Sequence, residues 1–206
     1  MKHLYFVRHG QTEWNAIRRM QGQWNSNLSD KGREHADVNG QLLSTLGIEA
    51  LYVSPLDRTR QTAEIINAYL NLAPVFDSRI MEWHCGDWSG EMYADIPVKW
   101  PEEWAGLETN RFHYRPPNGE NYPDMFERSI PFVDELLATE HSNIAVVSHG
   151  MIGKVMFSYL MGYAPDQTLA IHQHNDMVFR VTVDGAHRDI CYFSEGRGPC
   201  PGLPTE

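Results

Sequence analysis

Arginine and histidine side chains follow three short apolar segments of the chain. Arg8 and His9 follow the first segment, Arg58 follows the second, and His149 follows the third. An arginine guanidinium is a planar fork of donors that fits the oxygens of a phosphate group. A neutral imidazole can bind the same group or attack it as a nucleophile. Brought together, such side chains would bind an anion and could transfer a phosphoryl group.

The three apolar segments are predicted to be buried strands that alternate with helices. Such alternation is typical of an α/β protein, here a three-layer α/β/α sandwich with a mostly parallel, mixed sheet. Ligands of such sheets collect outside the carboxyl ends of the strands, which is where the polar residues lie. The strands are His3–Val7, Ala50–Val53 and Asn143–Val147, and the helices begin after Ser29, after Ser54-Pro55 and after Gly150.

The rest of the chain is expected to complete one domain, residues 1–206. Residues 177–183 and 189–193 are predicted to form an antiparallel pair at one edge of the sheet. Residues 91–124, rich in Trp and Pro, interrupt the pattern and are interpreted as an inserted cap. A helix is predicted from about 123 to 138, with a kink or break at Pro131. The Pro- and Gly-rich residues 196–206 are predicted to be an irregular tail.

Composition narrows the class of protein. The net charge of -10 opposes sequence-independent binding of nucleic acid, which depends on basic side chains. No apolar run reaches the length of a membrane span, and no signal peptide is recognised, so we expect a soluble, cytoplasmic protein. The three widely spaced cysteines favour a reducing compartment over a disulfide framework or a zinc site. An anionic ligand must therefore be held by a few local cationic groups.

Five separate blocks of sequence resemble those of the histidine phosphatase superfamily, which includes the cofactor-dependent phosphoglycerate mutases. The first block contains Arg8-His9-Gly10 and continues to Asn15, and the other blocks follow in the family's order over most of the chain. The blocks are Leu4–Asn15, Arg19–Gly22, Ser54–Ala63, Glu82–Gly90 and Ser148–Gly150. Asn27-Leu28-Ser29 replaces the usual Pro-Leu-Thr, and Cys85 replaces a frequent Phe, but neither change falls on the proposed chemistry.

The resemblance implies a role for each residue of the site. His9 is the nucleophile, and one of its ring nitrogens attacks phosphorus while an acceptor holds the other nitrogen in one tautomer. Arg8, Arg58 and His149 are expected to bind the transferred phosphate. Asn15, Gln21, Gly22 and Gly150 are expected to line the same pocket. The family needs no metal ion, and no cofactor is expected for this chain.

Glu82 is the candidate general acid in this scheme. It would protonate the leaving alcohol and then, as a carboxylate, accept a proton from water. Its segment resembles the family pattern of Glu, three residues, Gly, any residue, Trp and Gly, and the pocket is expected to be walled by Trp83 and Trp88. The other carboxylates that compete for the acid role are Asp57, Glu13 and Asp87.

Other polar residues allow more than one interpretation. His172 and His174 have the spacing of one strand face and could hold a metal with a third ligand, although a surface or interface pair is the simpler interpretation. Arg60 is expected to pair with Asp57 or Glu64. Trp100 and Trp104 are expected to pack the cap onto the body. Residues Arg111, His113 and Arg115 either hold a second anionic group of the substrate or form an exposed basic patch.

The short insert favours hydrolysis of a small phosphate ester over mutase activity. Mutases of the family carry a longer insert, and Pro116–Asn121 resembles the Pro-Pro-Gly-Gly-Glu-Ser segment of its broad-specificity phosphatases. A phosphoglycerate mutase is the alternative, and a non-catalytic phosphate-binding protein is a third hypothesis that the intact set of residues disfavours. The sequence does not name a substrate, and it is compatible with a homodimer.

Overall fold

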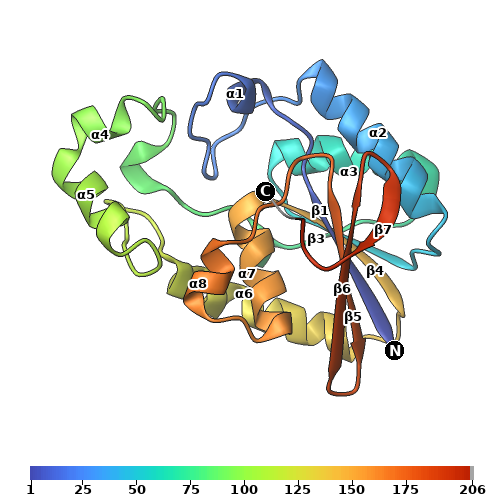
Figure 1. Ribbon diagram of the computed structural model, residues 1–206. Coiled ribbons are helices and arrows are strands. Elements are labelled where there is room, and N and C mark those ends of the chain that lie inside the picture. The colour runs from blue at the N-terminus through green and yellow to red at the C-terminus, as the bar shows by residue number, and fades with distance from the viewer. Residues whose placement is uncertain (205–206) are drawn as a thin grey trace.

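The computed structural model describes residues 1–204, which form a mixed seven-stranded sheet flanked by helices (Figure 1). The strand order is β3-β2-β4-β1-β5-β6-β7, in which β1, β2, β3 and β4 are parallel and the last three strands are antiparallel to their neighbours. The predicted fold class is therefore confirmed. The strands are β1 (Lys2–Arg8), β2 (Ala50–Val53), β3 (Val75–Phe76), β4 (Asn143–Ser148), β5 (Val178–Asp184), β6 (His187–Ser194) and β7 (Arg197–Pro201).

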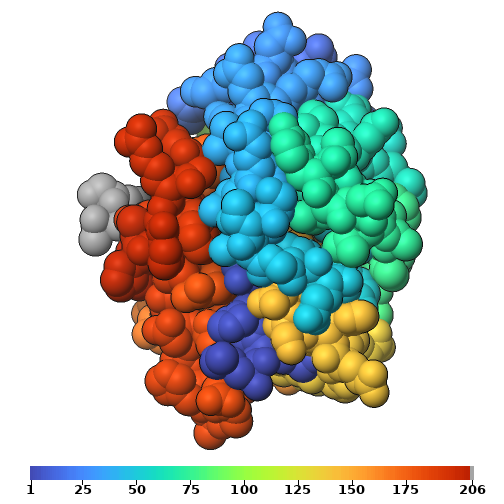
Figure 2. Space-filling view, turned by 90° about the vertical axis from the view of Figure 1, so that its right-hand side faces the viewer, coloured from blue at the N-terminus to red at the C-terminus, as the bar shows by residue number. Residues whose placement is uncertain are grey.

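Two pairs of helices cover the two faces of the sheet. Helices α2 (Asp30–Ser44) and α3 (Asp57–Leu70) pack on one face, where Leu43, Ile66 and strand residues form one core cluster. Helices α6 (Tyr122–Ala138) and α7 (Gly150–Met161) pack on the other face in a second cluster. Figure 2 shows α2 and α3 covering the first face, with the C-terminal strands beside α2. The short helices are α1 (Glu13–Ala16) and α8 (Pro165–Leu169).

The local signals read from the sequence explain where these elements begin. The Ser29 side chain accepts a hydrogen bond from the Gly32 amide at 3.1 Å and caps α2, as predicted. Strands β1 and β4 lie in the middle of the sheet with helices on both faces, which is why their sequences are almost wholly apolar. Both strands end at the same edge of the sheet, so their polar tips meet.

Residues Arg197–Pro201 form strand β7, contrary to the irregular tail predicted for residues 196–206, of which 205 and 206 lie outside the described residues. Strand β7 pairs with β6, and it is therefore β7, not the predicted β5–β6 pair, that ends this side of the sheet. The turn between them is a tight hairpin because Glu195 and Gly196 have φ values of 50° and 71°. Prolines in β7 are tolerated because an edge strand has backbone positions that need no partner.

The predicted break at Pro131 is absent. Helix α6 runs from Tyr122 to Ala138 through this proline. Pro131 lies on the exposed side of the helix, while Phe132 and Val133 beside it are buried in the core. The carbonyl group that Pro131 leaves unbonded can therefore be solvated by water, and packing of the inner face maintains the helix.

The segment between residues 91 and 124 forms a separate small layer beside the sheet, as expected for a cap. It contains α4 (Ile96–Lys99) and α5 (Pro101–Thr109), which lie away from the strands in Figure 1. Its own cluster is built on Met20, Cys85, Trp88 and Ile96. Trp100 and Trp104 pack against this cluster, which confirms their predicted packing role.

A glycine contact between the first loop and α2 supplies a test of the fold. A Cβ atom on Gly32 would lie 1.9 Å from the Gln11 carbonyl oxygen, so Gly32→Ala must displace backbone next to His9. We expect Gly32→Ala to lower the free energy of unfolding by about 1–3 kcal/mol in urea titrations. Gly153→Ala is the control, because its Cβ would meet nothing closer than 3.6 Å. Equal stability of the two variants would contradict this packing.

Candidate active site

A pocket of about 260 Å³ opens at the carboxyl ends of β1 and β4. Eight of the nine residues predicted from the sequence line it, and only His149 does not. Strand β1 supplies Arg8, and the loops and helices that follow β1, β2 and β4 supply most of the others. The eight are Arg8, His9, Asn15, Gln21, Gly22, Arg58, Glu82 and Gly150.

His9 is buried and held in one tautomer. Its Nδ1 atom lies 2.7 Å from the carbonyl oxygen of Gly10. A carbonyl oxygen can only accept, so Nδ1 carries the proton and Nε2 keeps its lone pair. Burial lowers the pKa of His9 well below its ordinary value, and the charges of Arg58 and Arg8 act in the same direction. The ring is therefore neutral at pH 7, as a nucleophile must be.

Arg58 is fixed by bonds to all three of its nitrogens. Its terminal nitrogens donate to the carbonyl oxygens of Gly22 at 2.7 Å and Trp24 at 2.8 Å. Its Nε donates to Nδ1 of His149 at 3.1 Å. The side chain is only 1 % exposed, and burial lowers its pKa to about 10. This buried cation is ion-paired to no carboxylate within residues 1–204.

His149 is not among the residues that line the pocket, and its predicted contact with phosphate stays a prediction. Because Arg58 Nε can only donate, His149 Nδ1 is the acceptor and its Nε2 carries the proton. Nε2 then donates to Ser54 Oγ at 2.7 Å. Both ring nitrogens are thus occupied, and His149 acts on the pocket by orienting Arg58. Its ring centroid lies 5.2 Å from that of His9.

Two residues that sequence reasoning missed hold Arg8 and His9 in place. The Gln173 carbonyl accepts a bond from Arg8 at 2.7 Å, and the Asn175 amide donates to the His9 carbonyl at 2.7 Å. The Arg8 Nε atom is buried and has no partner within residues 1–204. The antiparallel pairing of β5 with β1 places the loop before β5 beside the end of β1. This pairing of β5 with β1 is the feature from which the positions of Gln173 and Asn175 could have been inferred.

Glu82 lies against the first turn of α7. Its carboxylate accepts hydrogen bonds from the backbone amides of Met151 and Ile152 at 3.1 Å and from that of Trp83 at 2.9 Å. The N-terminus of a helix favours a negative charge, so these bonds suit the ionised side chain. Trp83 lines the pocket beside it, but Trp88 is fully buried in the cap, contrary to the expectation that both line the pocket.

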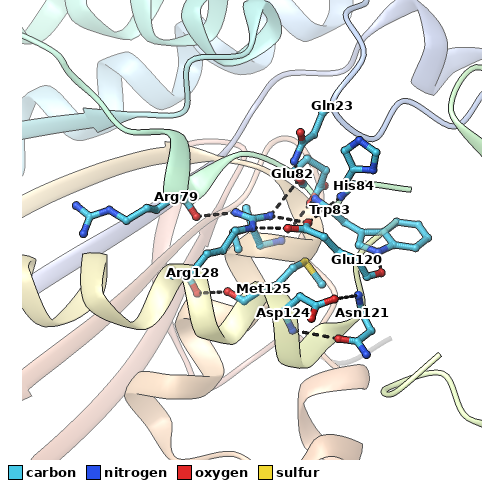
Figure 3. A network of polar contacts seen from close by, with 12 residues as sticks. Gln23, Arg79, Glu82, Trp83, His84, Glu120, Asn121, Asp124, Met125 and Arg128 are labelled. Carbon is cyan, nitrogen blue, oxygen red and sulfur yellow. Dashed lines mark hydrogen bonds and ion pairs between the residues drawn. The ribbon is translucent and has the colours of Figure 1, made fainter. Parts of the chain in front are cut away.

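An ion pair outside the pocket holds the segment that carries Glu82 (Figure 3). Arg128 donates to the carbonyl oxygens of Arg79 at 2.6 Å and Glu82 at 3.2 Å. Its partner Glu120 accepts from Arg128 Nε at 2.9 Å and from the His84 amide at 2.9 Å. Helix α6 and the end of the cap therefore fix residues 79–84, a role that the sequence did not indicate for Arg128.

Three smaller contacts complete the pocket wall. The Asn15 Oδ1 atom accepts from the Thr12 amide at 3.1 Å, which leaves the Asn15 NH2 group for the pocket. Gln21 is buried, and its Oε1 atom has no partner within the described residues. Gly22 adopts φ of 51°, and its carbonyl faces Arg58. These residues lie where the sequence placed them.

Several alternative candidates lie outside the pocket. The rival acids Asp57, Glu13 and Asp87 do not line it, whereas Glu82 does. Among the described residues Arg60 forms no ion pair, contrary to expectation. It donates to the Pro55 carbonyl and stacks on Phe76 because the edge strand β3 lies beside it.

The structure places the three basic residues of the cap, Arg111, His113 and Arg115, in different surroundings. Arg115 pairs with Asp124 at 2.5 Å, and His113 is exposed. Arg111 lines an adjoining, more apolar pocket of about 110 Å³. The two pockets share Met20, Trp83, Tyr93 and Met151 as walls.

His172 and His174 lie in a loop rather than on a strand, and both line the main pocket. Within residues 1–204, no three His, Cys, Asp or Glu side chains are grouped as a metal would require. Lys154, another lining residue that sequence reasoning missed, comes one turn after Gly150 on α7. In the same described range, no helix is long and apolar enough to cross a bilayer.

Comparison with known proteins identifies the class. The chain matches the histidine phosphatase superfamily (branch 1) over residues 4–194, so it belongs to this family. It is 35% identical over 187 residues to the Probable phosphoglycerate mutase GpmB of Erwinia tasmaniensis, covering 88% of this chain and 85% of that one. Phosphoserine phosphatase 1 of Hydrogenobacter thermophilus is 31% identical over 163 residues, covering 79% and 77% of the two chains.

Solved structures agree with this assignment. A mycobacterial glucosyl-3-phosphoglycerate phosphatase, solved with VO3, superposes with a TM-score of 0.82 at 28% identity, covering 88% of this chain and 93% of that one. The Bacillus stearothermophilus protein YhfR gives a TM-score of 0.86 at 28% identity, covering 96% and 100%. The relatives thus carry both phosphatase and mutase names.

The two buried imidazoles give a prediction that needs no assay of activity. We expect His9 and His149 to titrate well below pH 6.5 when followed by NMR, because burial and two guanidinium groups oppose protonation. The unfolded chain binds these protons near the ordinary pKa, so stability present at neutral pH should fall as the pH drops below about 6.5. Titration of both rings at the ordinary value would contradict the described burial. His9→Asn and His149→Asn assign the two signals.

Proposed function

We propose that this protein is a phosphatase that hydrolyses small phosphate monoesters through a phosphohistidine on His9. The observation that carries the proposal is the geometry of His9: a neutral ring with its lone pair on Nε2, in a pocket with two guanidinium groups and a carboxylate. A transferred phosphoryl group needs a nucleophile, positive charge around its oxygens and a proton for the leaving oxygen. His9, Arg8 with Arg58, and Glu82 supply these three needs.

In the first half-reaction, His9 Nε2 attacks phosphorus and the bond to the ester oxygen breaks. The leaving oxygen takes a proton from Glu82, while Arg8 and Arg58 stabilise the negative charge on the other phosphate oxygens. The backbone amides around Glu82 suit its carboxylate form. A substrate phosphate that binds as its monoanion would bring the proton that Glu82 then passes to the alcohol.

In the second half-reaction, water attacks the phosphohistidine. The Glu82 carboxylate takes a proton from that water, the bond between phosphorus and Nε2 breaks, and inorganic phosphate leaves. The proton stays on Nδ1, hydrogen-bonded to the Gly10 carbonyl oxygen, throughout, so the ring returns to the same neutral tautomer. No step requires a metal ion or an organic cofactor.

The cap favours hydrolysis over phosphoryl return. Its two helices have four and nine residues, and neither lines the main pocket, which leaves room for water at the phosphoenzyme. Two relatives with phosphatase names support this reading. A phosphoglycerate mutase is the second candidate, because a relative that is 35% identical carries that name.

Primer dependence separates the two candidates. We expect phosphate release from 3-phosphoglycerate and other small esters in EDTA, without any added 2,3-bisphosphoglycerate, because water can reach the phosphoenzyme. The measurement is colorimetric phosphate release, with the His9→Asn variant as the background control. Isomerisation to 2-phosphoglycerate that needs the bisphosphate and releases no phosphate would establish a mutase instead.

Leaving-group dependence tests Glu82 and the ion pair behind it. We expect Glu82→Gln to reduce kcat/KM for alkyl phosphates by about a hundredfold or more, and to affect p-nitrophenyl phosphate much less, because its leaving group needs little protonation. Arg128→Met should show the same pattern at about tenfold, since it displaces Glu82 without removing it.

Arg115→Met is the matched control for Arg128→Met. It removes the same charge from an exposed ion pair that does not touch residues 79–84, and its leaving-group dependence should match that of the wild type. If Glu82→Gln slows both classes of ester equally, Glu82 is not the acid. If Arg128→Met slows both classes of ester equally, Arg128 does not position Glu82.

A further inference from the structure

Lys154 is a cation of the pocket that the proposed chemistry does not use. It lies on α7 and lines the pocket together with Gly150 and Met151 of the same helix. Its side chain is partly buried. Within residues 1–204 its ammonium group has neither an ion-pair partner nor a hydrogen-bond acceptor.

 

Seven ion pairs are formed within residues 1–204, and Lys154 takes part in none of them. Charged side chains are seldom buried unless they are paired. A half-buried lysine without a carboxylate partner is therefore unusual in a chain whose net charge is -10. Burial and the nearby charges of Arg111 and Arg8 lower the pKa of Lys154 to about 8, so it is still mainly protonated at pH 7. The group that would neutralise Lys154 is therefore absent from the described protein.

The position of Lys154 fixes where an anion would bind. Gly150, at the start of α7, lies against Arg8: a Cβ atom there would be 3.3 Å from Arg8 Nε. Lys154 comes four residues later, which is about 6 Å further along the helix axis. The phosphate end of the pocket and the Lys154 ammonium are thus separated by the length of a short carbon chain, and both face the same cavity.

The charge at this second position suits a carboxylate. Arg8 and Arg58 supply two guanidinium groups for a phosphate that can carry two charges. Of the other two cations that line the pocket, Arg19 lies over the Trp14 ring, and Lys154 supplies one ammonium group. One ammonium balances one carboxylate, and a hydrogen bond between two charged groups is among the stronger polar contacts. Arg111, in the adjoining pocket, adds positive potential on the same side.

We propose that Lys154 binds a carboxylate of the substrate, which makes the substrate a small phosphate ester with a carboxylate a few bonds from the ester oxygen. This inference rests on the proposed phosphatase function, since it assigns the other end of the same ligand to Arg8 and Arg58. Lys154 is thus a specificity-determining residue: it selects among phosphate esters and takes no part in the transfer of the phosphoryl group.

A matched pair of esters tests this assignment. 3-Phosphoglycerate and glycerol 3-phosphate share the phosphate and the carbon chain, and differ by a carboxylate in place of a hydroxymethyl group. We expect the wild type to favour 3-phosphoglycerate in kcat/KM by about tenfold or more, and Lys154→Met to bring this ratio close to one, mainly through KM. Lys154→Arg should retain part of the ratio because it keeps the charge.

The control variant and pH separate binding from a structural effect. Lys31→Met removes the same charge from an exposed position on α2 and should keep the wild-type ratio. The ratio should fall as the pH rises through about 8 in the wild type and stay flat in Lys154→Met. The ionisable groups that face Lys154 are Glu82, Arg8, Arg111, Tyr93, His172 and His174, and their effects on phosphate transfer are common to both esters and cancel in the ratio.

Binding to an inactive variant keeps the two proposals distinguishable. In the His9→Asn background, calorimetry should show tighter binding of 3-phosphoglycerate than of glycerol 3-phosphate, and Lys154→Met should remove the difference. If the difference is present but the wild type hydrolyses neither ester, the phosphatase proposal fails and the carboxylate site stands. Another outcome is that hydrolysis depends on His9 but Lys154→Met lowers kcat/KM equally for both esters, or changes it for neither. The carboxylate site is then wrong and the phosphatase proposal stands.

Discussion

Arg58 and Arg8 bring two guanidinium groups into the pocket without an ion-paired carboxylate among residues 1–204, and the rest of the site depends on this constraint. Arg58 is almost fully buried and is held by two carbonyl oxygens and an imidazole, while Arg8 is held by the carbonyl of Gln173. Removing such charges from water is costly, and carbonyl dipoles compensate for this only in part. A bound phosphate group would supply the missing negative charge. The uncompensated free energy of desolvating the two guanidinium groups therefore favours binding of an anion.

The same two cations determine the state of the histidines. Their charges, added to burial, keep His9 and His149 neutral, and the bond to Gly10 leaves the His9 lone pair on the nitrogen that faces the pocket. The proposed acid lies at the N-terminus of α7, where the amides of Met151 and Ile152 hold Glu82. Nucleophile and acid are thus carried by different elements, and the packing of the sheet sets their relative position.

Much of the fold and of the site could be predicted from local patterns in the sequence. The apolar runs ending at Arg8 and Ser148 predict buried parallel strands, and the rule that ligands collect at strand ends brings His9, Arg58 and Glu82 into one pocket. The family resemblance supplied the choice of Glu82 over Asp57 and Asp87, since the spacing of carboxylates alone does not rank them.

The features that sequence reasoning missed depend on long-range contacts. Gln173 acts through its backbone carbonyl, which any residue possesses, and Lys154 is distinguished only by the absence of a partner in the folded chain. Strand β7 forms because the outer edge of β6 is available, although Pro and Gly disfavour a strand. Pro131 is tolerated because it falls on the exposed side of α6, which depends on how that helix packs.

The most direct test of the central claim is to find the phosphoryl group on the enzyme. The protein is mixed briefly with a 32P-labelled phosphate ester, quenched in alkali and mapped by mass spectrometry. The account predicts an alkali-stable, acid-labile phosphohistidine at residue 9, absent from His9→Asn and released as inorganic phosphate on further incubation. Label on another residue, or turnover with label undiminished in His9→Asn, would contradict it.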